Sequence, residues 1–517
     1  MASRVAAAQV RAWVEDGREL ALLDAREEGE FGQAHPFWAV PCPLSRAEQR
    51  LPALLPRPGT RVVCTDDGSG LAERLAALAE AMGGRDVHVL DGGTAVWEAA
   101  GGVLFSGVNV PSKAFGEWVE HHYGTPSVDA AELRGWLDAG RDVAVLDSRP
   151  FAEFHCMSIP GGRCVPGGEL AYRVADLVPD PATLIVVNCA GRTRSILGAE
   201  SLRRAGVPNR VLALRNGAMG WRLAGLETAQ GETASYAPGA PGTAALALDR
   251  ARAFAEARGV GLIGVAGLAR FEADPARTLY VLDVRAPDEY RAGHRPGSLS
   301  APGGQLVQAT DAWIAVRGAR IALVDDDGVR ARMAAGWLRE MGHRDVFVVE
   351  GALTGRLETG DAPRPAPPDV PLVGPDAVEG ALVVDLARSI EFREEHIPGA
   401  IWGIRTRLGT LRDRLTGASR VVATSPDGDL ARWAVAELRG LTGAPIAALD
   451  GGTAAWREAE RPLAASRDNP PDEACVDFYL RPYDRNSGVE AAMLAYLGWE
   501  VDLPGEVARD GQARFGA

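Results

Sequence analysis

Residues 184–195 read Leu-Ile-Val-Val-Asn-Cys-Ala-Gly-Arg-Thr-Arg-Ser. The apolar run predicts a buried strand that ends on Cys189, and residues 195–205 have a helical pattern that Gly206 stops. A short loop therefore joins the strand to the helix, and we expect its backbone N–H groups to point at the sulfur. Arg192 and Arg194 add positive charge, which favours thiolate over thiol. Cys189 is thus a candidate nucleophile facing an anionic substrate. The alternative is a small buried cysteine at a strand end.

The composition is that of a soluble globular protein with several domains. The chain has 517 residues, of which 46% are apolar and 24% charged, and this length suits about four domains of ordinary size. A net charge of −14 argues against nucleic acid or an anionic membrane as a partner. No apolar run reaches the roughly 18–20 residues of a membrane span. The six cysteines contain no C-x-x-C pair, so we expect no disulfide scaffold, no metal and a reducing cytoplasm.

Four segments of the chain repeat one pattern, in which an apolar strand ends in an aspartate and a glutamate follows six positions later. These pairs are Asp24 and Glu30, Asp147 and Glu153, Asp283 and Glu289, and Asp385 and Glu391. The first three repeats also carry an arginine two residues after the aspartate, and each repeat later runs through a glycine turn into a helix. Alternating strands and helices predict parallel sheets covered on both faces, with a site at the carboxyl end of a central strand. Because the charged pairs recur in repeats without a cysteine, we interpret them as structural.

These motifs resemble those of the rhodanese sulfurtransferases over almost the whole chain. The resemblance implies an α/β fold of four tandem rhodanese-like domains, each a parallel β-sheet flanked by helices on both faces. In that family the nucleophile opens a six-residue loop, which here runs from Cys189 to Arg194. Phosphatases on the same fold need one residue more and carry arginine six positions after the cysteine, where this chain has Ser195. Loop length therefore favours sulfur over phosphorus chemistry.

The repeats and the proline-rich stretches between them set the expected boundaries. We expect domains at residues 1–105, 125–235, 244–362 and 370–465, a linker at residues 106–124 and a C-terminal extension at residues 466–517. The extension contains five aromatic residues between Phe478 and Trp499, which predicts packing onto another domain.

Aligning the four loops predicts one strong active site. The position of Cys189 is assigned to Cys64 in the first repeat, Asp325 in the third and Ser425 in the fourth. A carboxylate or a hydroxyl does not form a persulfide, so the third and fourth domains are expected to be inactive. The loop after Cys64 has two carboxylates and no arginine, which disfavours both thiolate and an anionic donor. Cys64 therefore remains a possible secondary site only.

The resemblance implies a thiosulfate sulfurtransferase that works through a Cys189 persulfide, without metal or organic cofactor. The donor would be thiosulfate or a related small anion, and the acceptor cyanide, a thiol or a protein. We expect the N–H groups of the loop residues to stabilise the persulfide and its two arginines to hold the donor; the loop residues are Ala190, Gly191, Arg192, Thr193, Arg194 and Ser195. Two alternatives stay open: a non-catalytic binding or sulfur-relay array, and a cysteine phosphatase.

Overall fold

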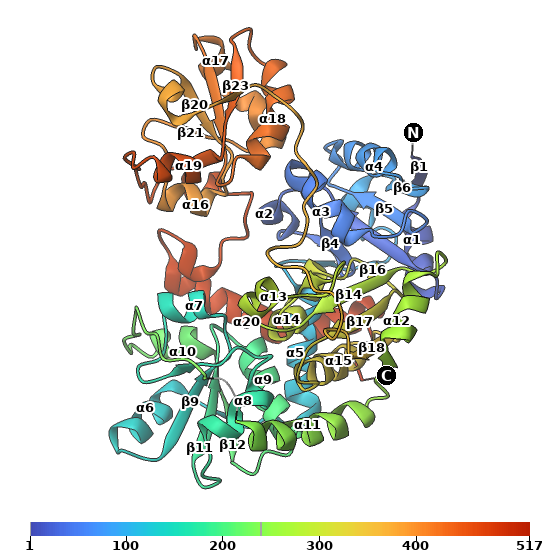
Figure 1. Cartoon of the computed structure of the whole chain (residues 1–517), viewed down its shortest axis with the longest axis vertical. Helices are drawn as coiled ribbons and strands as arrows, with labels where there is room; N and C mark the ends of the chain where they lie inside the picture. The colour runs from blue at the N-terminus through green and yellow to red at the C-terminus, as the bar shows by residue number, and fades with distance from the viewer. Residues whose placement is uncertain (1, 238–239, 517) are drawn as a thin grey trace.

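The computed structural model describes residues 2–237 and 240–516 and contains four mostly parallel sheets, each with helices on both faces (Figure 1). The central strands are buried over most or all of their length, because apolar runs such as Leu20–Asp24 are covered by helices on both faces of the sheet. This confirms the predicted fold class. No helix among these residues is both long and apolar enough to cross a membrane.

The first sheet has the order β1-β6-β5-β2, with β4 beside β2. Its segment contains β1 (Ser3–Val5), α1 (Ala7–Glu15), β2 (Leu20–Asp24), α2 (Glu28–Phe31), β3 (His35–Pro36), β4 (Ala39–Pro41), α3 (Ala47–Leu54), β5 (Arg61–Thr65), α4 (Leu71–Ala81), β6 (Asp86–Leu90) and β7 (Leu104–Phe105).

The second sheet has the order β10-β9-β11-β12-β8 and is parallel throughout. Its segment contains α5 (Val110–Tyr123), β8 (Ser127–Val128), α6 (Ala130–Asp138), β9 (Val143–Asp147), α7 (Phe151–Cys156), β10 (Arg163–Cys164), α8 (Leu170–Leu177), β11 (Leu184–Asn188), α9 (Thr193–Arg204), β12 (Val211–Leu214) and α10 (Gly217–Leu223).

The third sheet, β13-β18-β17-β14-β15, repeats this order. Its segment contains α11 (Pro241–Glu256), β13 (Gly261–Gly264), α12 (Val265–Glu272), β14 (Leu279–Asp283), α13 (Pro287–Ala292), β15 (Leu299–Ser300), α14 (Gly303–Gln308), β16 (Val316–Arg317), β17 (Arg320–Val324), α15 (Arg330–Glu340) and β18 (Val346–Glu350).

The fourth sheet, β19-β23-β22-β20-β21, repeats it again and is followed by the C-terminal extension. These segments contain β19 (Leu372–Val373), β20 (Leu382–Asp385), α16 (Ser389–Glu394), β21 (Ile401–Trp402), α17 (Arg412–Thr416), β22 (Val421–Thr424), α18 (Asp429–Arg439), β23 (Ile446–Leu449), α19 (Gly452–Glu458) and α20 (Val489–Asp510).

The second and third domains face each other across an approximate two-fold axis. Trp337 donates a hydrogen bond to Ser201, which lies 136 positions earlier in the chain. Gly168 and Gly304 have the same spacing and meet backbone to backbone, so close that a Cβ on Gly304 would lie 2.7 Å from the nitrogen of Gly168. Contacts between equivalent residues of two repeats place those residues on the symmetry axis. The two domains therefore form a pair.

The other two domains are joined to this pair in different ways. Strand β16 of the third domain adds antiparallel to β2 of the first, so the first sheet is completed from a distant part of the chain. The fourth domain keeps separate apolar clusters of its own and contacts the first through Arg405, which pairs with Glu48.

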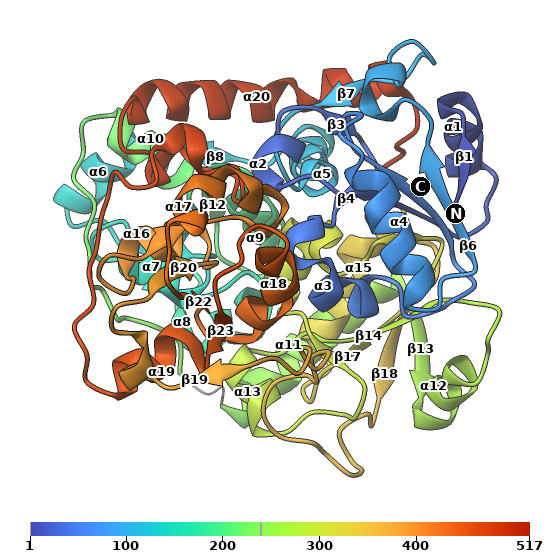
Figure 2. The ribbon, with the colours of Figure 1, turned by 90° about the horizontal axis from the view of Figure 1, so that it is seen from above.

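The expected linker at residues 106–124 is mostly helix, because α5 occupies Val110–Tyr123. It packs against α9 of the second domain and against α20 of the extension (Figures 1 and 2). The predicted packing of the aromatic extension onto another domain is confirmed by this arrangement, in which α20 lies along one side of the molecule (Figure 2).

Candidate active site

Cys189 follows β11 directly and opens the loop that leads into α9. Its side chain is buried, and its thiol donates to the hydroxyl of Ser195 at 3.4 Å. The carbonyl of Cys189 accepts from the N–H of Ala218 at 2.8 Å, which fixes the loop against the start of α10. Gly217 is needed at this contact, because it has a φ of +53° and a Cβ there would lie 2.3 Å from the Cys189 carbonyl oxygen.

The backbone N–H groups after Cys189 are available to an anion. For the six residues from Ala190 to Ser195, no N–H has an acceptor within the described part of the chain. Three of these groups belong to the first turn of α9, where helical geometry leaves N–H groups unpaired. Together with the helix dipole they form an anion-binding loop next to the sulfur.

Arg194 lies beside this loop and is held by a carboxylate. It donates to both oxygens of Glu153, at 2.9 and 2.8 Å, and to Gln305 of the third domain at 3.5 Å. Burial favours the protonated form of Glu153, but the charges of Arg194 and Arg481 outweigh it and lower the pKa of Glu153 to about 2. The Arg194 charge also interacts favourably with Cys189. Glu153, which we interpreted as structural from the sequence, thus lies in the site.

Arg192 is engaged more fully than Arg194. It donates to both oxygens of Glu117 on α5, each at 2.7 Å, and it also pairs with Glu120 and Asn216. Arg192 therefore joins α5 to the Cys189 loop through these ion pairs. Its expected role in holding the donor stays a prediction.

A pocket of about 240 Å³ lies over Cys189 between several parts of the chain. Besides the loop, its lining includes Lys113 of α5, Gln305 and Gln308 of α14, and aromatic and charged side chains of the C-terminal extension. The extension contributes Phe478, Tyr479, Arg481, Tyr483, Tyr496 and Glu500. None of these residues was predicted from the sequence, because no local motif links them to the cysteine. The aromatic content of the extension was the one signal that it packs onto another domain.

The first-repeat equivalent of Cys189 is Asp66, and the assignment of Cys64 to that position is wrong. Asp147 pairs in register with Asn188, the residue before Cys189, and Asp24 pairs with Thr65, the residue before Asp66. Cys64 lies inside β5 and is fully buried. Burial, together with nearby Cys42 and Asp66, raises the pKa of the Cys64 thiol well above its usual range.

Asp66 also fills the anion-binding loop of its own domain. Its carboxylate accepts from the N–H groups of Gly68 and Ala72, at 2.8 and 3.0 Å. The first domain therefore carries its own negative charge at the position where the second domain leaves N–H groups unpaired.

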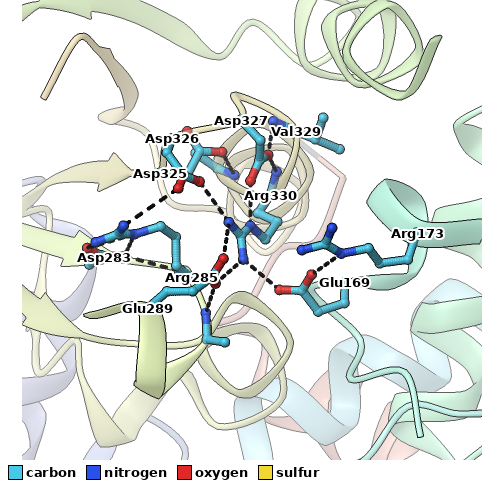
Figure 3. A network of polar contacts seen from close by, with 12 residues as sticks. Glu169, Arg173, Asp283, Arg285, Glu289, Asp325, Asp326, Asp327, Val329 and Arg330 are labelled. Carbon is cyan, nitrogen blue, oxygen red and sulfur yellow. Dashed lines mark hydrogen bonds and ion pairs between the residues drawn. The ribbon is translucent and has the colours of Figure 1, made fainter. Parts of the chain in front are cut away.

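The third domain fills its loop in the same way (Figure 3). Asp325 accepts from the N–H of Ala331, and Asp327 accepts from the N–H groups of Val329 and Arg330. Burial and the charge of Asp327 raise the pKa of Asp325 well above its usual range.

Arg330, the equivalent of Arg194, is surrounded by four carboxylates: Glu169, Glu289, Asp326 and Asp327. Glu169 comes from the second domain (Figure 3), so each domain of the pair sends a side chain to the arginine of the other. In the fourth domain Ser425 stands at the cysteine position and accepts from the N–H of Ala431.

The aspartate–arginine pairs of the repeats are buried and structural in their contacts. Asp147 accepts from the Arg149 side chain at 2.9 and 2.7 Å and from Asn188 at 2.9 Å, which ties β9 to β11 below the site. Asp24 with Arg26 and Asp283 with Arg285 repeat this pair. Within residues 2–237 and 240–516, no cluster of three or more His, Cys, Asp or Glu side chains could hold a metal ion.

Comparisons with known proteins agree with this architecture. The Rhodanese-like domain family matches residues 6–100, 129–224 and 268–357, which leaves the fourth sheet unmatched. The crystal structure of a thiosulfate sulfurtransferase from Pseudomonas aeruginosa is 46% identical and covers 99% of each chain, with a TM-score of 0.93. An HTH-type transcriptional regulator, Rv0324, from Mycobacterium tuberculosis is 32% identical over 224 residues, 42% of this chain and 87% of that protein.

Proposed function

This chain belongs to the rhodanese-like domain family and is a sulfurtransferase, and from that premise we propose that Cys189 carries the transferred sulfur. The donor is thiosulfate or a related small sulfane anion. The acceptor is a nucleophile such as cyanide or a thiol. We place the reaction in the cytoplasm and assign it no metal or organic cofactor.

In the first step the Cys189 thiolate attacks the outer sulfur of thiosulfate. The sulfur–sulfur bond of the donor breaks, sulfite leaves with the electron pair, and Cys189 becomes a persulfide. In the second step the acceptor attacks the outer sulfur of this persulfide, which releases the Cys189 thiolate. Cyanide is thereby converted into thiocyanate, and no external oxidant or reductant is consumed.

The loop supplies the electrostatic stabilisation that both steps need. The unpaired N–H groups of Ala190 to Ser195 supply hydrogen-bond donors for the negative charge of the thiolate and the persulfide, and Arg194 adds its positive charge beside them. The observation that carries the proposal is the contrast among the four loops. Only the second has a thiol at this position, whereas the first and third fill the same loop with a carboxylate of their own.

Intact mass spectrometry of the full chain after incubation with thiosulfate tests this proposal. We expect a gain of one sulfur atom, located by peptide mapping to Cys189, and its loss on addition of cyanide. Cys189→Ala should show no gain. A protein that gains no sulfur but retains its cellular role would favour a binding or relay array. Faster hydrolysis of an aryl phosphate than sulfur transfer would favour a phosphatase.

A further inference from the structure

The C-terminal extension reaches the Cys189 pocket through one short segment. Residues 476–484, which we call the closing segment, contribute Phe478, Tyr479, Arg481 and Tyr483 to the pocket lining. The segment interacts electrostatically with the Cys189 loop through Glu153, the carboxylate that pairs with Arg194. The charge of Arg481 helps to lower the pKa of Glu153.

Arg481 is oriented by its own neighbours. Its Nε and Nη2 donate to Asp484 at 2.7 and 3.2 Å, and its guanidinium carbon lies 4.8 Å from the ring centre of Tyr483 and 5.6 Å from that of Phe478. Its Nη1 has no acceptor among the residues that the structure describes. One edge of the guanidinium is therefore fixed, and a terminal N–H group remains for a ligand.

The other cations of the pocket are more fully paired. Arg192 is bound by two glutamates and Asn216, and Arg194 uses both terminal nitrogens on Glu153. Lys113 donates to Glu500 at 2.9 Å and to Tyr496. Among these three arginines, Arg481 is thus the one with a terminal nitrogen, Nη1, that has no acceptor within the described residues.

The closing segment is held in place by the first and fourth domains, two of the three domains that have no cysteine at the loop position. The N–H of Gly29 in the first domain donates to the carbonyl of Val476 at 2.7 Å. The N–H of Ser389 in the fourth domain donates to the carboxylate of Asp477 at 2.7 Å. These two hydrogen bonds connect the first and fourth domains to the segment that carries Arg481.

We propose that Arg481 is a substrate-binding residue of the Cys189 site, which binds the sulfonate end of the anionic sulfur donor. The first and fourth domains serve this role by positioning the closing segment. A charged arginine with a free N–H group suits a tetrahedral oxyanion, while the unpaired N–H groups of the loop serve the reacting sulfur. This inference rests on the proposed function and deepens it.

The test separates the two half-reactions in the full chain. For Arg481→Ala, we expect the rate of persulfide formation at low thiosulfate to fall about tenfold to a hundredfold, as for loss of a hydrogen bond to a charged group. Cyanide discharge of preloaded persulfide should keep its wild-type rate, because that step involves no sulfonate. Arg481→Lys should recover part of the loading rate. Arg509→Ala, on the exposed side of α20, is the matched control and should behave as wild type.

A binding measurement without turnover completes the test. In a Cys189→Ala background, sulfite affinity should fall by the same factor when Arg481→Ala is added. Equal losses in loading and discharge, or unchanged loading and sulfite affinity, would overturn the role of Arg481. A wild-type chain that never gains sulfur on Cys189 would instead overturn the proposed function.

A substitution at Asp477 tests whether the hydrogen bond from the fourth domain positions the closing segment. Asp477→Ala removes the carboxylate that accepts from the N–H of Ser389, and we expect it to raise the KM for thiosulfate without changing discharge by cyanide. An unchanged KM would show that this anchor does not position Arg481.

Discussion

Arg194 donates to both carboxylate oxygens of Glu153, and the same relationship recurs 136 positions later between Arg330 and Glu289. The third domain keeps this pair although it has an aspartate in place of the cysteine. The pair is therefore part of how the loop is built, and in the second domain it also brings a positive charge to the thiol.

Removing Arg194 should weaken the stabilisation of negative charge in the Cys189 site and the binding of the anionic donor. We expect Arg194→Ala to lower kcat/KM for thiosulfate by an amount equivalent to about 2–4 kcal/mol, and Arg194→Lys to recover part of it. Unchanged kinetics would move the donor-binding role to the other arginines of the pocket.

The low pKa of Glu153, about 2, predicts a pH-dependent contribution to stability. Because this value lies below that of an unfolded glutamate, near 4.3, the Arg194 pair stabilises the fold above about pH 4.3 and loses this effect as the pH falls towards 2. Glu153→Gln should therefore lower Tm most at neutral pH, and its Tm should approach that of wild type in acid. A difference in Tm that stays constant across this range would contradict the prediction.

Arg192 should matter more for stability than for donor binding. Its partner Glu117 is fully buried, so Arg192→Ala leaves a buried carboxylate without its main counter-charge, at a cost of about 3–5 kcal/mol in the free energy of unfolding. Chemical denaturation measures this loss. Arg192→Met combined with Glu117→Leu should recover much of it. A stable Arg192→Ala variant with a raised KM would instead show the donor-binding role expected from the sequence.

Cys64 should be dispensable for sulfur transfer. Its thiol is buried inside β5, and burial raises its pKa well above the usual range, so it offers no thiolate to a donor. We expect Cys64→Ala to retain thiosulfate:cyanide activity with a small loss of Tm from the cavity. A gain of sulfur on Cys64 in the Cys189→Ala variant would contradict this.

A cysteine placed in the third domain should stay inactive. In Asp325→Cys the N–H groups of Val329 and Arg330 still bind Asp327, and Arg330 still has four carboxylates around it. Mass spectrometry in a Cys189→Ala background should detect no added sulfur. Sulfur on residue 325 would show that these carboxylates do not block the loop.

The sequence was sufficient to predict the part of the site that is formed by one continuous stretch of the chain. The strand, cysteine and helix of residues 184–205 lie as expected, since buried apolar runs and a glycine stop decide them. In the first repeat, sequence reasoning aligned Cys64 with Cys189, because the apolar residues Val62 and Val63 suggest a strand that ends at Cys64. The strand end is set by pairing between Asp24 and Thr65, which no local pattern reveals.

The rest of the pocket depends on contacts between distant segments. Arg481 lies almost 300 positions from Cys189, and Glu117 belongs to a segment expected to be a linker. Charge and burial at such contacts follow from how the domains pack. The composition of the sequence indicates this packing only in general terms, through the aromatic residues of the extension.

The completion of the first sheet by β16 has a consequence for synthesis on the ribosome. Leu20 and Ala21 of β2 find their antiparallel partners only at Arg317 and Val316, about 300 residues later. Although β4 pairs with the rest of this edge, Leu20 and Ala21 stay unpaired until that segment leaves the exit tunnel, and an open strand edge is prone to pair with other chains. The N-terminal domain is therefore synthesised first, but its sheet is completed only after β16 has been synthesised. Chaperones that cover exposed strand edges should raise the yield of folded protein.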